Sequence, residues 1–266
     1  MTNVQHALSH HWAVPAFGFS LVTDDGVRIS GTRLGAADPG RPAIVAVHGL
    51  MGWHAKPRFA TFVEQLTPWF TVYAFDMRGH GDSEGVSDFG GAEIQDVDAV
   101  VAFARAEGHT RVVTVGTSQG AIAVIRHAGL LGGVDAVVGI SSLAYWDWHG
   151  GADPVARRQL HARIGTRSGR AALRAWGVHL PDHWEEPESP EEVVGKIAPT
   201  PVVIIHGTDD RLFAVDHARR LYDAAGEPKR LLLGDGFGHA EDGLTPAFAR
   251  HLVEVLHETL GLPWSG

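Results

Sequence analysis

The chain has 266 residues, 44% hydrophobic and 20% charged, with a formal net charge of −9 when histidine is neutral. This length suits one α/β domain with a small insertion, and the acidic balance disfavours nucleic acid or an anionic membrane as a partner. The lack of cysteine excludes disulfides, thiol nucleophiles and thiolate metal ligands. No secretory signal opens the chain and no apolar stretch approaches ~18 residues, so we expect a cytoplasmic protein without integral membrane contact.

The N-terminal part of the chain predicts a loose leader followed by a hairpin. We expect residues 1–16 to form the leader. Two apolar-rich segments, 17–22 and 27–32, flank the tripeptide Asp24-Asp25-Gly26. That arrangement is typical of two antiparallel strands joined by a tight turn.

Strands and helices then alternate along the rest of the chain. Further strands are predicted at 43–48, 70–76, 111–117, 136–142, 201–207 and 229–234. Helices are predicted at 57–67, at 92–107, from about residue 119, at 215–224 and at 245–259. Eight strands with an antiparallel start and a parallel remainder predict a doubly wound, mostly parallel α/β sheet. Residues 144–199, between the sixth and seventh strands, are too many for an ordinary connection and predict an insertion.

The pentapeptide Gly116-Thr117-Ser118-Gln119-Gly120 is the strongest chemical motif. An apolar run leads into it and another follows it, so the serine lies on a sharp turn between a strand and a helix. A serine there is exposed for nucleophilic attack, and side chains at the flanking glycines would collide with neighbouring backbone.

An acid and a base follow the serine, each just past the carboxyl end of a predicted strand. Asp210 ends the segment His206-Gly207-Thr208-Asp209-Asp210, and His239 ends Gly236-Phe237-Gly238-His239. Open α/β sheets place their sites at this edge. Asp209 and Asp235 are alternative acids. A third strand of this kind ends in His48-Gly49-Leu50.

With these features and the segment Asp76-Met77-Arg78-Gly79-His80-Gly81-Asp82-Ser83, the chain resembles the α/β-hydrolase superfamily over nearly its whole length. It is most similar to the branch of serine esterases and monoacylglycerol-lipase-like enzymes. Ser118 argues against haloalkane dehalogenases and epoxide hydrolases, which use an aspartate nucleophile. The resemblance implies an eight-stranded core formed by residues 1–143 and 200–266, with a small lid, or cap, formed by residues 144–199 and inserted between strands six and seven.

The resemblance also implies a catalytic triad. His239 would activate Ser118, and Asp210, favoured over Asp209 by the family spacing H-G-x-x-D, would orient His239. The backbone N–H groups of Leu50 and Gln119 would form the oxyanion hole. A second set of residues is expected to brace strand-end turns: His48, His206, Asp76 and Arg78.

Residues 144–199 carry half of the eight tryptophans of the chain. We expect Trp146, Trp148 and Trp176 to bind apolar or aromatic parts of a substrate, and the alternative is that they fill the core of the lid. The same region contains six arginines between residues 157 and 174. These could meet an anionic substrate tail, a CoA phosphate or an acidic carrier protein, or form a solvated face paired with the glutamates at 185–192.

We expect neither metal nor cofactor, because none of the 17 histidines has a metal-ligand spacing and no nucleotide-binding motif is present. The predicted function is hydrolysis of a carboxylic ester with a small or medium apolar or aromatic acyl group through an acyl-enzyme. The alternatives are a thioesterase or amidase with the same triad, a lyase, C–C hydrolase or peroxidase on the same scaffold, and a non-catalytic ligand receptor. The oligomeric state is open, with a homodimer as one option.

Overall fold

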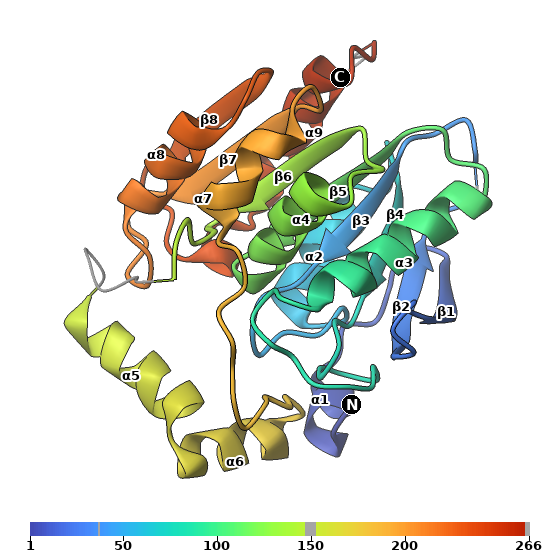
Figure 1. Ribbon diagram of the computed structural model, residues 1–266. Helices are drawn as coiled ribbons and strands as arrows, with labels where there is room; N and C mark the ends of the chain where they lie inside the picture. The colour runs from blue at the N-terminus through green and yellow to red at the C-terminus, as the bar shows by residue number, and fades with distance from the viewer. Residues whose placement is uncertain (37, 147–152, 264–266) are drawn as a thin grey trace.

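The computed structural model describes residues 1–263 apart from residue 37 and residues 147–152 (Figure 1). The strands are β1 (Ala16–Val22), β2 (Arg28–Leu34), β3 (Ala43–Val47), β4 (Thr71–Phe75), β5 (Val112–Thr117), β6 (Ala136–Ile140), β7 (Val202–Gly207) and β8 (Lys229–Gly234). The helices are α1 (Asn3–Leu8), α2 (Pro57–Gln65), α3 (Glu93–Ala106), α4 (Gln119–Leu130), α5 (Pro154–Gly165), α6 (Arg167–Trp176), α7 (Pro190–Val193), α8 (Val215–Ala224) and α9 (Pro246–Thr259), with short 3₁₀ turns η1 (Val194–Ile197) and η2 (Ala240–Gly243).

The described strands form one eight-stranded sheet in the order β1-β2-β4-β3-β5-β6-β7-β8. β2 pairs antiparallel with both β1 and β4, and the pairs from β4 through β8 are parallel. The register in the centre of the sheet places Val45 of β3 beside Tyr73 of β4 and Thr114 of β5. The predicted α/β sheet with an antiparallel start is therefore confirmed.

Helices cover both faces of the sheet (Figure 1). Alternate side chains of the central strands enter two separate cores, one on each face. Val45 and Val47 pack in the core beneath α3, α4 and α8, whereas Ile44 and Ala46 pack in the core beneath α2 and α9. All five residues of β3 are buried because helices cover both faces. This double burial explains why the central strands read as continuous apolar runs in the sequence.

The insertion between β6 and β7 divides into two parts. Helices α5 and α6 pack on each other and stand apart from the sheet and the helices that cover its two faces (Figure 1). α7 and η1 instead pack against α4 of the core. Capping residues define the helices of the first part: Asp153 accepts from the N–H of Val155 at the start of α5, and Gly177 ends α6 in the left-handed conformation.

The N-terminal segment is ordered, and the prediction of a loose leader was wrong. Residues 3–8 form α1, whose first turn is closed by a capping box between Thr2 and Gln5. The Gln5 side chain is fully buried, and the Trp53 indole donates to Ser9 Oγ at 2.9 Å. A six-residue helix is too short to show a helical period in the sequence, so its order depends on these tertiary contacts.

Candidate active site

Ser118 occupies a strained turn between β5 and α4. Its backbone φ is 52° and ψ −115°, a conformation that few non-glycine residues adopt. The glycines beside it are sterically required: a Cβ at Gly116 would lie under 3.0 Å from the backbone of Gly120, and a Cβ at Gly120 equally close to that of Val47. The turn therefore presents the Ser118 hydroxyl at the carboxyl edge of the sheet.

His239 and Asp210 extend from Ser118 as a continuous hydrogen-bonded chain. His239 Nε2 lies 2.8 Å from Ser118 Oγ, and His239 Nδ1 lies 2.7 Å from Asp210 Oδ2. The loops after β8 and β7 supply the two residues. The structure thus brings together the three side chains that the sequence predicted to act as one unit, in the order that such a unit requires.

The Asp210 carboxylate is fixed on both of its oxygens. Oδ1 accepts the backbone N–H groups of Leu212 at 2.8 Å and Phe213 at 2.9 Å, so Oδ2 is left to face His239. Burial opposes ionisation, but the hydrogen bond and charge of His239 outweigh it and the pKa of Asp210 is lowered. The rival Asp209 is exposed to solvent, and its backbone N–H bonds to Phe237 O.

The two residues predicted to supply oxyanion-hole amides, Leu50 and Gln119, line the same cavity as Ser118. Gln119 is the first residue of α4, so its N–H has no partner within the helix and lies at the positive end of the helix dipole. The chain at Gly49 runs against the nucleophile, since a Cβ there would lie 3.1 Å from Ser118 Cβ. Leu50, the next residue, lines the same cavity as Ser118 and Gln119.

His48 and His206 lie fully buried behind this site. His48 Nε2 accepts the backbone N–H of Met77 at 3.2 Å, and its Nδ1 lies 2.8 Å from Gly49 O. Burial lowers the pKa of His48 to about 3, so the ring is neutral and Nδ1 donates. His206 Nε2 lies 3.0 Å from Phe213 O, which ties β7 to the loop that carries Asp210. Both rings hold strand-end turns.

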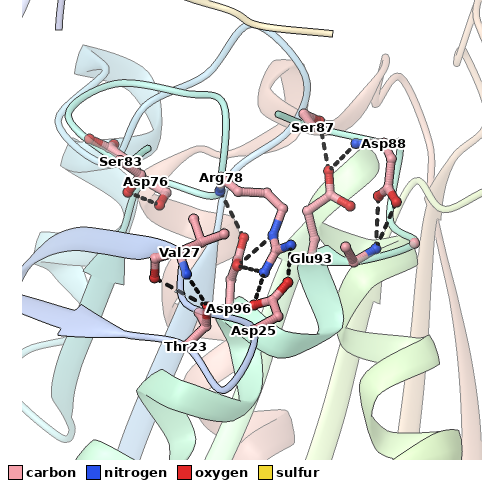
Figure 2. Close-up of polar contacts among 12 residues, drawn as sticks. Thr23, Asp25, Val27, Asp76, Arg78, Ser83, Ser87, Asp88, Glu93 and Asp96 are labelled. Atoms are coloured by element: carbon pink, nitrogen blue, oxygen red, sulfur yellow. Dashed lines mark hydrogen bonds and ion pairs between the residues drawn. The ribbon is translucent and has the colours of Figure 1, made fainter. Parts of the chain in front are cut away.

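The turn after β4 is held by buried charged groups, some of which are drawn in Figure 2. Asp76 Oδ1 bonds to His54 Nδ1 at 2.8 Å, and Asp76 Oδ2 accepts the N–H of Asp82 at 2.8 Å. Arg78 binds Asp96 and Asp25, each within 2.8 Å. These contacts explain the bracing role expected of Asp76 and Arg78.

A buried carboxylate that the sequence analysis did not single out lies beside the site. Glu93, the first residue of α3, accepts from Ser87 Oγ at 2.6 Å and from the N–H of Asp88 (Figure 2). It also accepts from the N–H of Gly90. Gln119 Nε2 also donates to it at 2.8 Å. Burial raises the pKa of Glu93 well above its ordinary value. No sequence pattern marks it, because its partners are brought together only by the fold.

A cavity of about 600 Å³ opens over Ser118 and His239. Its lining is largely apolar and includes Ile122, Leu143, Trp146, Trp184 and Phe213. Trp146 and Trp184 meet edge to face with ring centroids 5.2 Å apart. The cavity has the volume and apolar character of a small-molecule site.

The three tryptophans predicted to bind substrate have different positions. Trp146 lines the cavity. Trp176 is absent from the described lining and packs against Trp53 with ring centroids 6.1 Å apart. Trp148 lies outside the described residues. Trp184, which the sequence analysis did not select, also lines the cavity. Its ring meets that of Phe89 edge to face, with ring centroids 5.6 Å apart.

The described part of the chain contains no group of three or more His, Asp or Glu side chains arranged to hold a metal ion. None of its helices combines the length and the apolar character needed to cross a membrane.

Comparisons with known proteins agree with this architecture. The model of the Alpha/beta hydrolase family matches residues 44–259. The Pyrococcus furiosus esterase Pf2001 superposes with a TM-score of 0.73 at 21% identity, covering 98% of this chain and 96% of that one. The esterase RhEst1 from Rhodococcus sp. ECU1013 gives a TM-score of 0.69 at 20% identity, covering 92% and 99%.

A relative of similar sequence is the uncharacterized protein YfhR of Escherichia coli strain K12. It is 26% identical over 232 residues, which are 84% of this chain and 72% of YfhR. The family match spans the elbow, the strand-end loops and the final helix described above. The chain belongs to the alpha/beta hydrolase family.

Proposed function

We propose that the protein is a cofactor-independent serine hydrolase that cleaves a carboxylic ester through an acyl-enzyme. The hydrogen-bonded chain Ser118–His239–Asp210 at the floor of the cavity carries this proposal. A serine hydroxyl is barely ionised at neutral pH and needs an adjacent base, which His239 Nε2 provides. Family membership supports a hydrolase, and the two structural neighbours named as esterases favour an ester.

In the first half of the reaction Ser118 Oγ attacks the ester carbonyl while His239 takes its proton. The N–H groups of Leu50 and Gln119 stabilise the oxyanion, each contributing about 3–4 kcal/mol. His239 then returns the proton to the leaving alcohol. Asp210 keeps the Nδ1–H tautomer in place and stabilises the imidazolium.

In the second half a water molecule replaces the alcohol. His239 removes a proton from it, the resulting hydroxide attacks the acyl-enzyme carbonyl, and Ser118 leaves with its proton restored by His239. The products are a carboxylic acid and an alcohol. The largely apolar lining, with Trp146 and Trp184 on one side, suits a small or medium apolar or aromatic acyl group. The cytoplasmic location and the oligomeric state stay predictions from the sequence.

The experiment compares an ester, a thioester and an anilide of one acyl group with wild type and Ser118→Ala. We expect the ester to have the highest kcat/KM and the variant to lose about 10⁶-fold in turnover. Ser142→Ala is the matched control, since it removes a nearby buried hydroxyl that bonds only to Leu143 O at 2.9 Å among the described contacts. A faster thioester or anilide reaction would change the substrate class, and an active Ser118→Ala would reject the acyl-enzyme.

A further inference from the structure

One face of helix α5 forms the roof of the cavity over Ser118. The lining includes Ala156, Gln159, Leu160, Arg163 and Ile164, whose spacing of three, one, three and one residues follows a single helical stripe. Four of these residues are uncharged. The remaining one, Arg163, places a guanidinium group against a cavity whose lining is otherwise largely apolar.

The other charges of the lining are already balanced. Lys56 Nζ bonds to Glu241 at 3.0 Å, and Asp242 bonds to Arg58 Nη1 at 2.9 Å. The Arg163 side chain makes no hydrogen bond or ion pair with any other described residue. Of the charged side chains in the lining, a single positive charge is therefore left without a counter-ion, in a protein whose net charge is −9.

The acidic run of the insertion does not neutralise this arginine. Glu188 pairs with Lys196 at 3.2 Å, and Glu191 pairs with Arg220 at 2.8 Å. Glu192 closes the capping box of α7. The glutamates that make ion pairs in the described contacts thus pair with residues outside the arginine run. The alternative that the arginines at 157–174 and the glutamates at 185–192 pair with one another is therefore not supported by these contacts.

A guanidinium group recognises planar or tetrahedral oxyanions because it presents paired donors in a fixed fork. Leu160, Ile164 and Leu212 line the same cavity, so a substrate that fills it would exclude water from an oxyanion paired with Arg163, which is exposed in the free protein. A neutral substrate would offer no partner to the exposed Arg163 guanidinium. An anionic substrate would supply the missing counter-ion.

We propose that the substrate is an ester carrying a second, anionic group, a carboxylate or a phosphate, and that Arg163 binds this group. The inference rests on the proposed ester hydrolase function of Ser118. Arg163 is then a specificity-determining residue: it holds the remote end of the substrate while Ser118 acts on the ester carbonyl.

The test uses monoethyl esters of straight-chain dicarboxylic acids of increasing length. Each is paired with the neutral ester of the same length in which a primary amide replaces the free carboxylate. A second series uses ethyl esters of the same chain lengths that carry a terminal phosphate in place of the free carboxylate. It separates recognition of a carboxylate from recognition of a phosphate. The quantity measured is the ratio of kcat/KM for the anionic ester to that for its neutral partner.

We expect the wild-type ratio to exceed about 10 at the best chain length, and Arg163→Gln to reduce it by about 10-fold, mainly through KM for the anionic ester. Arg163→Glu should reverse the preference, and high salt should lower the wild-type ratio. Arg158→Gln is the matched control, because Arg158 is exposed on the same helix, as Arg163 is, but lies outside the cavity lining.

An equal ratio in wild type, Arg163→Gln and Arg163→Glu would overturn the inference, as would an equal loss in Arg158→Gln. The neutral esters keep this outcome separate from the proposed function. Ser118-dependent hydrolysis of the neutral esters without any anionic preference would reject the role of Arg163 alone. No Ser118-dependent hydrolysis of either ester would reject the proposed function itself.

Discussion

Replacement of Asp210 by asparagine is a sharp perturbation of the proposed triad because the structure dictates how the new amide must lie. In the native site Oδ1 accepts the N–H groups of Leu212 and Phe213, and Oδ2 accepts His239 Nδ1–H at 2.7 Å. An asparagine would keep its oxygen on the two backbone donors. Its NH₂ group would therefore face His239, where a donor meets a donor.

The imidazole can relieve that clash only by moving its proton from Nδ1 to Nε2. His239 Nε2 could then no longer accept the proton of Ser118, which lies 2.8 Å away. A triad with the wrong tautomer loses about 10⁴-fold in turnover, equivalent to about 5 kcal/mol of transition-state stabilisation. We expect kcat to fall by this factor with little change in folding, since the side chain keeps its shape and its backbone contacts.

The assay is steady-state hydrolysis of a simple ester, with circular dichroism as the check on folding. Asp209→Asn is the matched control: the residue is adjacent, exposed and anchored only through its backbone N–H in the described contacts. It should retain near-native kcat. The reasoning is refuted if Asp209→Asn is crippled while a folded Asp210→Asn enzyme hydrolyses the ester at near-native rates.

Three further outcomes follow from the structure. Gly120→Ala should fail to fold or lose at least 3 kcal/mol of stability, because its Cβ would lie under 3.0 Å from the backbone of β3; an unchanged melting temperature would contradict this. The carboxylate of Asp76 has a pKa of about 2, since the buried His54 ring outweighs the burial that would raise it, and the pKa of His54 is raised in turn despite its own burial. The Asp76 contribution, about 2 kcal/mol, should be present above its unfolded pKa of about 4 and lost as pH falls toward 2, whereas the His54 contribution should be full below about pH 6.5 and lost as pH rises through the raised pKa. Denaturant titration at a series of pH values should show the free energy of unfolding changing in both pH ranges for wild type and in neither for Asp76→Asn. The same pH dependence in both proteins would count against the Asp76–His54 pair. Finally, Trp146→Ala should lower the ratio of kcat/KM for a large aromatic ester to that for an acetyl ester, by a factor equivalent to about 1–3 kcal/mol of transition-state stabilisation. Trp176 lies outside the described lining, so Trp176→Ala should leave this ratio unchanged.

The sheet could be read from the sequence because its central strands are covered on both faces. Continuous apolar runs such as 43–47 and 202–205 are typical of strands buried on both faces, and they recur at the spacing of a doubly wound fold. Ser118 was equally readable, because a strained turn between a strand and a helix needs small residues on both sides. The position of His239 and Asp210 at strand ends then followed from the geometry of parallel sheets.

The features that could not be read depend on contacts between distant segments. Trp146 and Trp176 are the same residue type in one insertion, yet one faces the cavity and the other faces Trp53. Glu93 became visible only when the fold placed Gln119 and the loop after β4 around it. Helix α1 is stabilised by a capping box and buried contacts rather than by a periodic pattern. In each case the position of the residue depends on contacts between segments that are far apart in the sequence.

The covalent step at Ser118 is the central claim, and labelling with a fluorophosphonate followed by digestion and mass spectrometry tests it most directly. A fluorophosphonate reacts with a serine only where a base activates the hydroxyl and donors stabilise the phosphoryl oxygen. The account predicts one modified serine, Ser118, loss of ester hydrolysis in proportion to its labelling, and no labelling of Ser118→Ala. Modification of another serine while Ser118 stays free, with activity lost, would contradict it.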